Sequence, residues 1–440
     1  MNTPSQLNAS SRLLICLIAI ILLTAINFFF HGFFQGPTRF FGLLCTDTYD
    51  FFPGPLLHSE YRFTDYFDTQ KFRPDRGQTS QLPPTTILLF QLSRFLTEAT
   101  SRVASLVIFS IFQMAVFSAS VGRLLGAGGG NHGLSVPTRF WLAFAISICS
   151  YPVYFAIDRG HFALLACALV NFAIDSHLRN RRWSAAILIG LAAALRITPL
   201  VFAAIYLNRR DFRYLLAATV TTLVSWAISL ALVPLWLNGY GLDNWLDSFS
   251  NYAHMYISWP GGLGWSSSLY NLVRLARYLI GIPIDAILDS AYFAERVYSV
   301  ASIAILALLV FRIRHISSIT AFALLTWASI ALPHVTGDYY LSGLIAPMVL
   351  LATRSKPDLV ALTLLILLLV PKDYFYYYVT VYKLFDFKIM DIFEYQRLLR
   401  RGYSAVSIQA LIINPLLLVI LGLRLAWRDS DESSLQAENR

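Results

Sequence analysis

The sequence has few charged residues and few cysteines. Only 13% of its 440 residues are charged, whereas soluble globular proteins carry about a quarter. With 57% hydrophobic residues, the composition also excludes an intrinsically disordered chain. Its four cysteines, Cys16, Cys45, Cys149 and Cys167, are isolated, so neither a disulfide framework nor a CxxC metal site is expected. What the sequence does contain is a series of long apolar runs, typical of a membrane protein.

These runs predict an all-α, polytopic membrane helical bundle of about ten spans, because about 20 apolar residues in a helix cross the hydrocarbon of a bilayer. The expected spans are 13–30, 105–125, 140–157, 162–178, 214–237, 297–311, 316–332, 339–352, 359–370 and 405–427. The net charge of +9 comes from basic residues that sit mostly at the ends of these runs. They therefore indicate topology and not a nucleic-acid-binding face, and they place both termini in the cytoplasm.

This topology predicts one integral membrane domain, residues 1–428, followed by a disordered cytoplasmic tail, 429–440. Three polar segments are expected on the non-cytoplasmic face, namely 31–84, 238–295 and 371–404. An outward-facing site is therefore implied.

Residues 183–208 do not fit an ordinary span, because clusters of arginine flank both ends and Arg196-Ile197-Thr198-Pro199 interrupts the centre. A single crossing would place one arginine cluster on the wrong side of the membrane. Proline disrupts a helix, and such breaks are tolerated at membrane depth where they line a cavity. The segment is therefore predicted to be a re-entrant hairpin.

Arg196 is the most unusual residue of this hairpin. A cation within an apolar segment costs about 2.5 to 3.5 kcal/mol on insertion scales unless it is paired or hydrated. A phosphate group is one candidate partner, because the guanidinium fork matches its oxygens. An internal ion pair with Asp158 or Asp175 is the alternative.

Three further polar clusters are candidate sites on the outer side. Asp47 and Asp50 lie in the motif 46–53, just after the first span, where a carboxylate beside aromatic rings can act as a general base. A helix cap or two solvated acids would explain the same spacing. Asp-x-x-Asp is not the Asp-x-Asp of nucleotide-sugar metal sites, so no metal is indicated. The other clusters are the turn 158–161, with Arg159 and His161, and the pair 333–334 and 338–340; interfacial hydrogen bonding would also explain both.

Several separated segments together resemble one family, the C-type glycosyltransferases that use polyprenyl-phosphate sugars, and within it the mannosyltransferase-like proteins of family 87. The resemblance covers roughly residues 12–355. The segments, in the order of the family's motifs, are Asp47 with Tyr49, Phe51, Phe52 and Pro53; Leu82-Pro83-Pro84; Arg159-Gly160-His161-Phe162; 191–199; 266–271; and 333–340 with Pro347. Arg196 stands where the family usually has lysine, and His161 where it has an amide.

The resemblance implies a C-type glycosyltransferase fold and a metal-independent, inverting transfer without a cofactor. A hexose, mannose by the resemblance, would move from a polyprenyl-phosphate donor to a lipid-linked or glycan acceptor on the non-cytoplasmic face. Asp47 would be the base, with Asp50 as the reserve. The other expected contacts are the donor phosphate with Arg196, Arg159 and His161, and the substrates with Tyr49, Asn271, His334, Asp338 and Tyr340. The expected location is the bacterial inner membrane, with no nucleic-acid partner.

Three other classes of function stay open at this point, and a scaffold without catalysis is disfavoured among them by the cost of burying Arg196. A transporter or flippase of lipid-linked sugars also uses broken helices near the midplane of the bilayer. A polymerase or ligase of surface glycans is another polytopic enzyme with polyprenyl carriers. The sequence does not identify the sugar, the linkage, the acceptor or the length of the lipid.

Overall fold

A computed structural model describes the chain in several stretches. They are residues 9–35, 83–100, 102–127, 134–158, 162–208, 211–235, 242–243, 245–246, 266–273, 276, 284–354, 356–370, 376–379, 384–388, 404–407 and 412–428. Asp47, Tyr49, Asp50, Arg159 and His161 lie outside these residues, as do the expected tail 429–440 and most of the expected loops 31–84 and 238–295.

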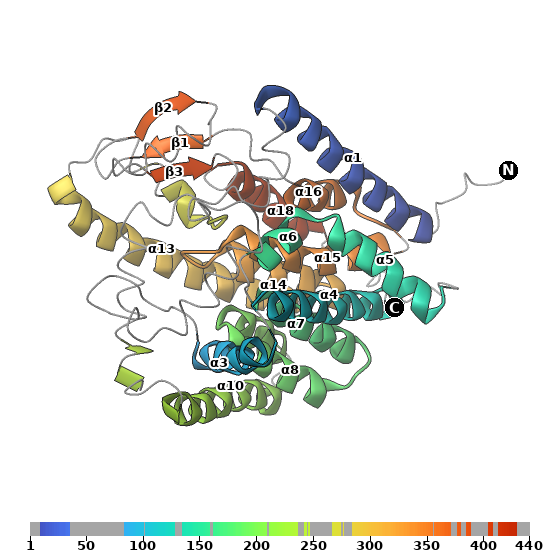
Figure 1. Ribbon diagram of the computed structural model, residues 1–440, viewed down its shortest axis with the longest axis vertical. Helices are drawn as coiled ribbons and strands as arrows, with labels where there is room; N and C mark the ends of the chain where they lie inside the picture. Colours follow the sequence, from blue (N-terminus) through green and yellow to red (C-terminus); the bar gives the residue numbers. More distant parts are fainter. Residues whose placement is uncertain are drawn as a thin grey trace.

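The described residues are mostly helical, as the sequence predicts (Figure 1). The first group of helices is α1 (Ala9–Gln35), α3 (Pro84–Ala99), α4 (Arg102–Ala127), α5 (Val136–Ile148), α6 (Tyr151–Asp158), α7 (Ala163–Leu178), α8 (Arg182–Leu195), α9 (Ala204–Asn208) and α10 (Phe212–Leu232). The second is α13 (Ile284–Ile313), α14 (Ser318–Ala331), α15 (Ile345–Ala352), α16 (Leu359–Leu369) and α18 (Asn414–Arg428). Short 3-10 helices are η4 (Thr198–Ala203), η5 (Val233–Leu235) and η8 (Asp338–Leu344).

Three of these helices are long and apolar enough to cross a membrane, namely Val107–Ala127, Phe212–Leu232 and Phe293–Ile313. Most other expected spans coincide with shorter apolar helices, which include α7, α14 and α16. The expected span 140–157 is divided into α5 and α6, because Pro152 cannot continue the first helix and instead lies in the first turn of the second.

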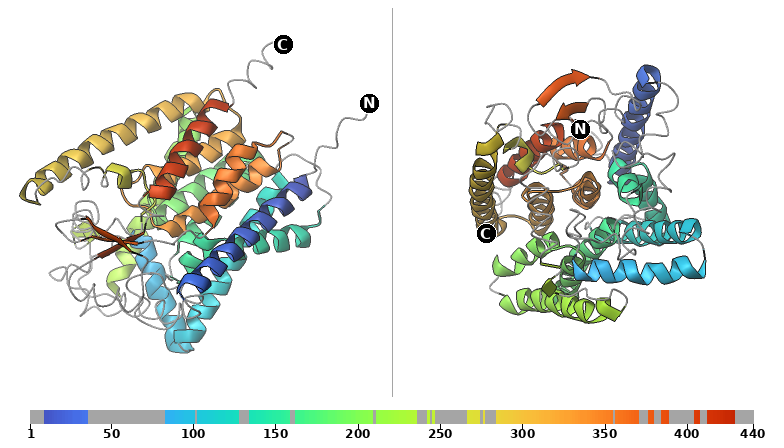
Figure 2. Two further views of the ribbon diagram at one scale, coloured as in Figure 1. Left: turned by 90° about the horizontal axis from the view of Figure 1, so that it is seen from above. Right: turned by 60° about the vertical axis from the view of Figure 1, so that its left-hand side comes forward.

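The small sheet is a feature that the sequence analysis did not anticipate. Strands β1 (Tyr376–Val379), β2 (Leu384–Lys388) and β3 (Ser404–Ser407) form an antiparallel sheet in the order β2-β1-β3. The last helix therefore begins at Asn414, later than the start of the expected span 405–427. In the left view of Figure 2, α1 begins and α18 ends on the side away from the sheet.

Helices α4 and α7 lie side by side and run in the same direction. The rings of Phe109 and Phe162 are 4.8 Å apart near their starts, and Arg123 Nε donates to Asp175 Oδ2 at 2.9 Å near their ends. A tight turn, in which Asn180 has φ 61°, then reverses the chain into α8. Asparagine is one of the few non-glycine residues that adopt this left-handed conformation readily.

Helices α8 and α10 also run in the same direction, although only a short segment separates them. Thr222 Oγ1 donates to Gly190 O at 3.0 Å, and one turn further along both helices Trp226 Nε1 donates to Ala194 O at 3.0 Å. A Cβ on Gly190 would lie 2.5 Å from Ala218 O, so glycine permits this close approach. Because the two helices are parallel, the chain between them must return to the level at which α8 began.

The contacts of this returning segment are direct. Tyr206 Oη donates to Arg182 O at 3.3 Å, and Arg182 Nη1 pairs with Asp211 Oδ2 at 2.8 Å. Residues after the Arg196 break therefore lie next to the start of α8. The segment from α8 through η4 and α9 is a helical hairpin, with Arg196 near its tip.

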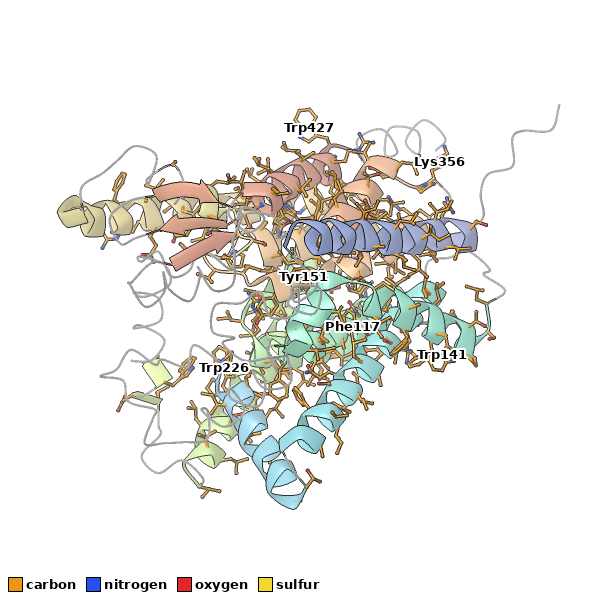
Figure 3. The ribbon with its side chains drawn as sticks, turned by 45° about the horizontal axis from the view of Figure 1, so that its top comes forward. Phe117, Trp141, Tyr151, Trp226, Lys356 and Trp427 are labelled. Carbon is orange, nitrogen blue, oxygen red and sulfur yellow. The ribbon has the colours of Figure 1, made fainter. Side chains whose placement is uncertain are left out.

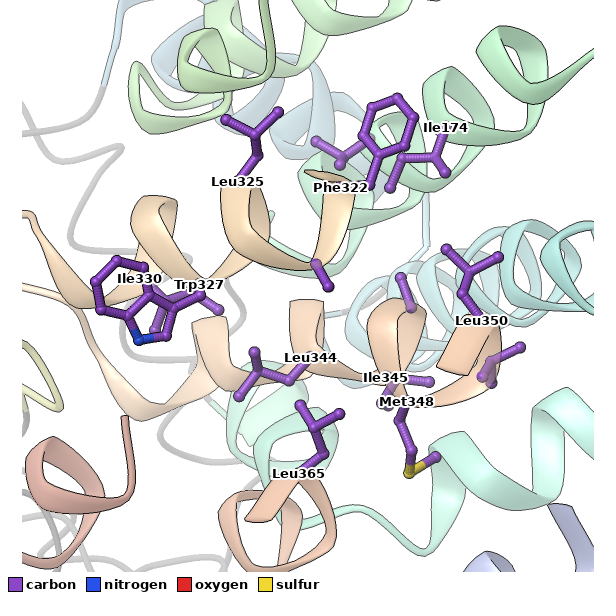
Figure 4. Close-up of a cluster of buried hydrophobic side chains, with 14 of the residues drawn as sticks. Ile174, Phe322, Leu325, Trp327, Ile330, Leu344, Ile345, Met348, Leu350 and Leu365 are labelled. Carbon is purple, nitrogen blue, oxygen red and sulfur yellow. The ribbon is translucent and has the colours of Figure 1, made fainter. Parts of the chain in front are cut away.

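The core extends from α1, α4, α5 and α7 through the hairpin to α14, α15, α16 and α18. Figure 4 shows buried apolar side chains from α7, α14, η8, α15 and α16 meeting in one cluster, among them Ile174, Phe322, Leu325, Leu344, Met348 and Leu365. Trp327 of α14 donates through Nε1 to Leu418 O of α18 at 2.6 Å. A Cβ at Gly422 would lie 2.5 Å from this indole, so α18 packs against α14 through a glycine.

Ion pairs gather at one end of the bundle, which we call the basic end and define by Arg123, Asp175, Arg179, Arg182 and Asp211. Asp175 accepts from Arg123 and also from Arg179, at 2.7 Å. Phe322, near the start of α14, lies 5.2 Å from His177 between ring centroids, so α14 also begins at this end. Arg354 bonds to Ser317, and Arg424 pairs with Asp358 at 2.9 Å. Figure 3 shows Lys356 and Trp141 at the end of the molecule away from the sheet.

Candidate functional site

Helix α8 ends at the Arg196-Ile197-Thr198-Pro199 motif, where the sequence predicts an interruption. The last residue of α8 is Leu195, and Arg196 follows with extended backbone angles, φ −159° and ψ 130°. Its N–H still donates to Ala192 O at 3.0 Å. Pro199 then lies in the first turn of η4, where its missing N–H does no harm. The break lets the Arg196 side chain leave the direction of α8 and reach toward η8.

Arg196 reaches an aromatic ring and no carboxylate among the described residues. Its Cζ lies over the ring of Tyr340, 2.9 Å from the centroid. Asp175, one of the two expected internal partners, is instead paired with Arg123 and Arg179. The side chain of Asp158, the other expected partner, lies outside the described residues. The expectation of an ion pair with Asp175 is therefore wrong.

A cavity of about 40 Å³ adjoins this guanidinium. It exceeds the volume of about 10 to 15 Å³ that one water molecule needs. The lining comes from α7, the hairpin, α14 and η8. It comprises Ala166, Cys167, Val170, Asn171, Arg196, Thr198, Pro199, Phe202, Thr326, Ser329, Ile330, Tyr340 and Gly343.

Several polar groups of the wall are held by neighbouring helices. Asn171 Nδ2 donates to Ser120 Oγ of α4 at 3.0 Å, and Ser120 Oγ donates to Phe117 O at 2.6 Å. Cys167 Sγ lies 3.7 Å from Ser342 Oγ. Cys167 is a free thiol, and its place in the wall of this cavity was not expected.

The start of α3 lies beside the tip of the hairpin. Thr86 Oγ1 donates to Leu195 O at 2.7 Å, and Ser229 Oγ of α10 donates to Thr85 Oγ1 at 3.1 Å. Pro83 and Pro84, from the second motif of the resemblance, immediately precede these threonines. The fold therefore brings the Pro-Pro motif and the Arg196 motif together.

Two other motifs of the resemblance join each other directly. Ser266 forms a bridge with Gly337, and Ser267 N donates to Thr336 O at 2.8 Å. Ser268 Oγ donates to His334 O at 2.8 Å. We call this paired arrangement of 266–268 with 334–337 the outer clasp.

Asn271 and His334, both expected to contact substrate, belong to this region. Asn271 is fully buried, and its Nδ2 donates to Ser266 O. His334 Nε2 lies 3.1 Å from Ser299 Oγ, and its ring meets those of Tyr270 and Tyr298 at centroid distances of 4.9 and 5.1 Å. Asp338 begins η8, although its side chain lies outside the described residues.

The site that the described residues form is thus smaller than the expected one. Arg196 and Tyr340 come together. His334 lies in the outer clasp, and Asn271 lies beside it. The aspartates of 46–53 lie outside the described residues. Sequence reasoning missed Asn171, although an amide within the apolar run of α7 was the available signal. Among the described residues, no three His, Cys, Asp or Glu side chains lie close enough to hold a metal ion.

Comparisons with known proteins identify relatives for the middle of the chain. A sequence model of glycosyltransferase family 87 matches residues 82–335. A polyprenol-phosphate-mannose-dependent alpha-(1-2)-phosphatidylinositol mannoside mannosyltransferase of Mycobacterium tuberculosis (strain ATCC 25618 / H37Rv) is 28% identical over 179 residues. That alignment covers 39% of this chain and 39% of the relative. The matched family segment includes both the hairpin and the Pro-Pro motif.

Proposed function

The chain belongs to glycosyltransferase family 87, and from this premise we propose that it moves a hexose, specifically mannose, from a polyprenyl-phosphate donor to a lipid-linked or glycan acceptor. The enzyme class and the membrane location follow from the family and from the apolar helices. The donor is proposed from the resemblance and from the mycobacterial relative, whose name specifies polyprenol-phosphate mannose.

The observation that carries the proposal is the environment of Arg196. Its guanidinium borders a cavity whose lining is mostly apolar, and it has no carboxylate partner among the described residues. A cation in such a place requires an anion or water to offset its desolvation. The phosphate of a lipid-linked sugar supplies an anion at this depth, because its polyprenyl chain lies in the surrounding hydrocarbon.

The proposed reaction is a single inverting displacement. The acceptor hydroxyl oxygen attacks C1 of the sugar as the bond from C1 to the phosphate oxygen breaks, and that oxygen keeps the electron pair. Asp47 takes the proton of the hydroxyl, with Asp50 as the reserve base. Arg196, Arg159 and His161 hold the departing phosphate and stabilise its developing charge. Tyr49, Asn271, His334, Asp338 and Tyr340 complete the proposed substrate site, which needs no metal.

We propose a topology of about ten spans plus the re-entrant hairpin, with the basic end in the cytoplasm and the site facing the periplasm of a bacterial inner membrane. The hairpin starts and ends beside the ion pair of Arg182 and Asp211, which supports this proposal. Trp183 is 54% exposed and lies in the first turn of α8, and such a ring favours the membrane interface.

A transfer assay tests the proposal. Full-length protein in membranes is incubated with radiolabelled polyprenyl-phosphate mannose, and labelled glycolipid products are separated from the donor. We expect label in a product, and we expect Asp47→Asn to reduce transfer by about 10² to 10⁴-fold while membrane insertion is unchanged. Full activity in both Asp47→Asn and Asp50→Asn would remove the base assignment. Movement of the donor across vesicles without transfer would favour the flippase alternative.

A further inference from the structure

The contact between Arg196 and Tyr340 uses one particular part of the guanidinium. Its Cζ lies over the ring, 2.9 Å from the centroid. At this separation an edge-on guanidinium would push its nitrogen atoms into the ring, so we take the flat face of the group to meet the aromatic face. The five N–H donors of arginine lie in the plane of the guanidinium and point outward from its edge. Stacking therefore leaves the donors available, whereas a carboxylate partner would use them.

From this geometry we infer that Tyr340 is a positioning residue, which holds the Arg196 guanidinium by its face so that its edge can bind the phosphate of a lipid-phosphate donor. The inference rests on the proposed function, and it replaces the expected role of Tyr340 as a contact to the sugar. Arg196 and Tyr340 both line the cavity, so the edge and the ring border the same space.

Tyr340 can fulfil this role because its own backbone is fixed. Its N–H donates to Gly337 O at 2.9 Å, at the start of η8. Gly337 and Thr336 are in turn held by the outer clasp, through the bridge to Ser266 and the bond from Ser267 N. The outer clasp thus fixes the backbone of the ring that covers Arg196 to residues 266–267.

An aromatic platform also suits a site that binds and releases its anion. An ion pair would have to be broken each time the donor enters, and breaking a poorly hydrated ion pair is costly. A cation on an aromatic face keeps its charge and its place during exchange of the ligand. Arginine is favoured over lysine here, because a planar group can stack and still present two parallel N–H bonds to phosphate.

The test compares two probes that differ by one phosphate, a C15 prenyl monophosphate and the corresponding C15 prenol. Binding to the purified full-length protein in detergent is measured by calorimetry, and the ratio of the two dissociation constants gives the preference for phosphate. The variants are Tyr340→Phe, Tyr340→Leu and Arg196→Gln. The matched control is Phe311→Leu, which removes an aromatic ring 5.5 Å from Arg314 on exposed α13.

We expect the wild type to prefer the monophosphate and Tyr340→Phe to keep this preference within about twofold. Tyr340→Leu should reduce it about tenfold by weakening the monophosphate alone, and Phe311→Leu should leave both affinities unchanged. Prenol affinity serves as the check that Tyr340→Leu is folded. Unchanged preference in Tyr340→Leu, or equal weakening of both probes, would overturn the inference.

The same data separate this inference from the proposed function. If the wild type prefers the monophosphate and Arg196→Gln loses that preference, the phosphate site stands whatever Tyr340 does. If the wild type shows no preference, or Arg196→Gln retains it, Arg196 does not bind phosphate, and both this inference and the phosphate role of Arg196 in the proposed function fail.

Discussion

The arginines at the basic end and the arginine of the cavity are stabilised in different ways. Asp175 is only 1% exposed, and it is bound by two arginines that are themselves about half exposed. Arg196 lies at the tip of the hairpin against Tyr340, without a carboxylate among the described residues. Both regions place charge among apolar helices.

The two environments separate residues that stabilise the fold from the residue that we propose binds the donor. At the basic end, the buried carboxylate is neutralised within the protein, and its partners keep contact with water. In the cavity, the positive charge is left without a described counter-ion, although Asp175 lies only one helical turn beyond Asn171 on the same helix. We therefore assign the paired charges of the basic end to stability, and we propose that the Arg196 charge is kept for a ligand.

Removing the positive charge of Arg196 should have the largest effect on transfer activity, and removing a charge of the basic end should have little. Arg196→Gln should reduce transfer by about 100-fold or more, because stabilisation of a departing oxyanion by one such group is worth about 10² to 10³-fold. Arg196→Lys should be partly active, since it keeps the charge and loses the planar fork. The matched variant Arg182→Gln should keep most of the transfer activity per folded molecule. Equal loss of activity in both glutamine variants would contradict the comparison.

The next effect concerns stability. The double variant Arg123→Gln with Arg179→Gln leaves the Asp175 carboxylate buried without its ion pairs, which should cost about 2 to 3 kcal/mol. This destabilisation is smaller than that of breaking a fully buried ion pair, because both arginines are partly exposed and screened by solvent. The melting temperature in detergent measures the loss, and transfer per folded molecule should stay near that of the wild type. A stronger effect on activity than on melting would extend the site to the basic end.

A third change gives the cavity an internal counter-ion. Asn171→Asp places a carboxylate in the wall that Arg196 also lines, so it should compete with the donor phosphate and raise the KM for donor about tenfold. Asn171→Leu is the uncharged control, which loses the bond to Ser120 and should change KM less than about threefold. An unchanged KM in Asn171→Asp would show that the donor phosphate does not share this space.

The sequence predicts the apolar helices well, because length and hydropathy decide a membrane span. It misses α3, whose segment contains Arg94 and Glu98, and it assigns the start of α13 to a loop because Asp285, Asp289 and Glu295 interrupt the apolar pattern. The part of a helix that extends beyond the membrane span can carry such charges, because it lies outside the hydrocarbon. Span length alone therefore underestimates helix length at the polar ends.

For the site, the sequence identifies the unusual residue but not its neighbours. Arg196 stands out because a cation in an apolar run is costly, and Pro199 marks the break beside it. That Asp175 pairs with Arg123 and not with Arg196 depends on the parallel packing of α4 and α7. The stacking of Tyr340 depends on the outer clasp, which joins segments far apart in the chain. Such contacts follow from tertiary packing, and one sequence does not specify it.

The smallest effect is expected from a substitution in the wall of the cavity. A Cβ at Gly343 would meet Cys167 Sγ at 3.6 Å and Thr326 Cγ2 at 3.7 Å, which are ordinary contact distances. Gly343→Ala should therefore leave the melting temperature nearly unchanged and raise the donor KM about twofold, because one methyl group narrows the wall beside the guanidinium. Gly190→Ala is the contrasting variant, since its Cβ would lie 2.5 Å from backbone and should lower the melting temperature. A large rise in KM for Gly343→Ala would mean that the donor fills the cavity completely, and no change would place the phosphate at its mouth.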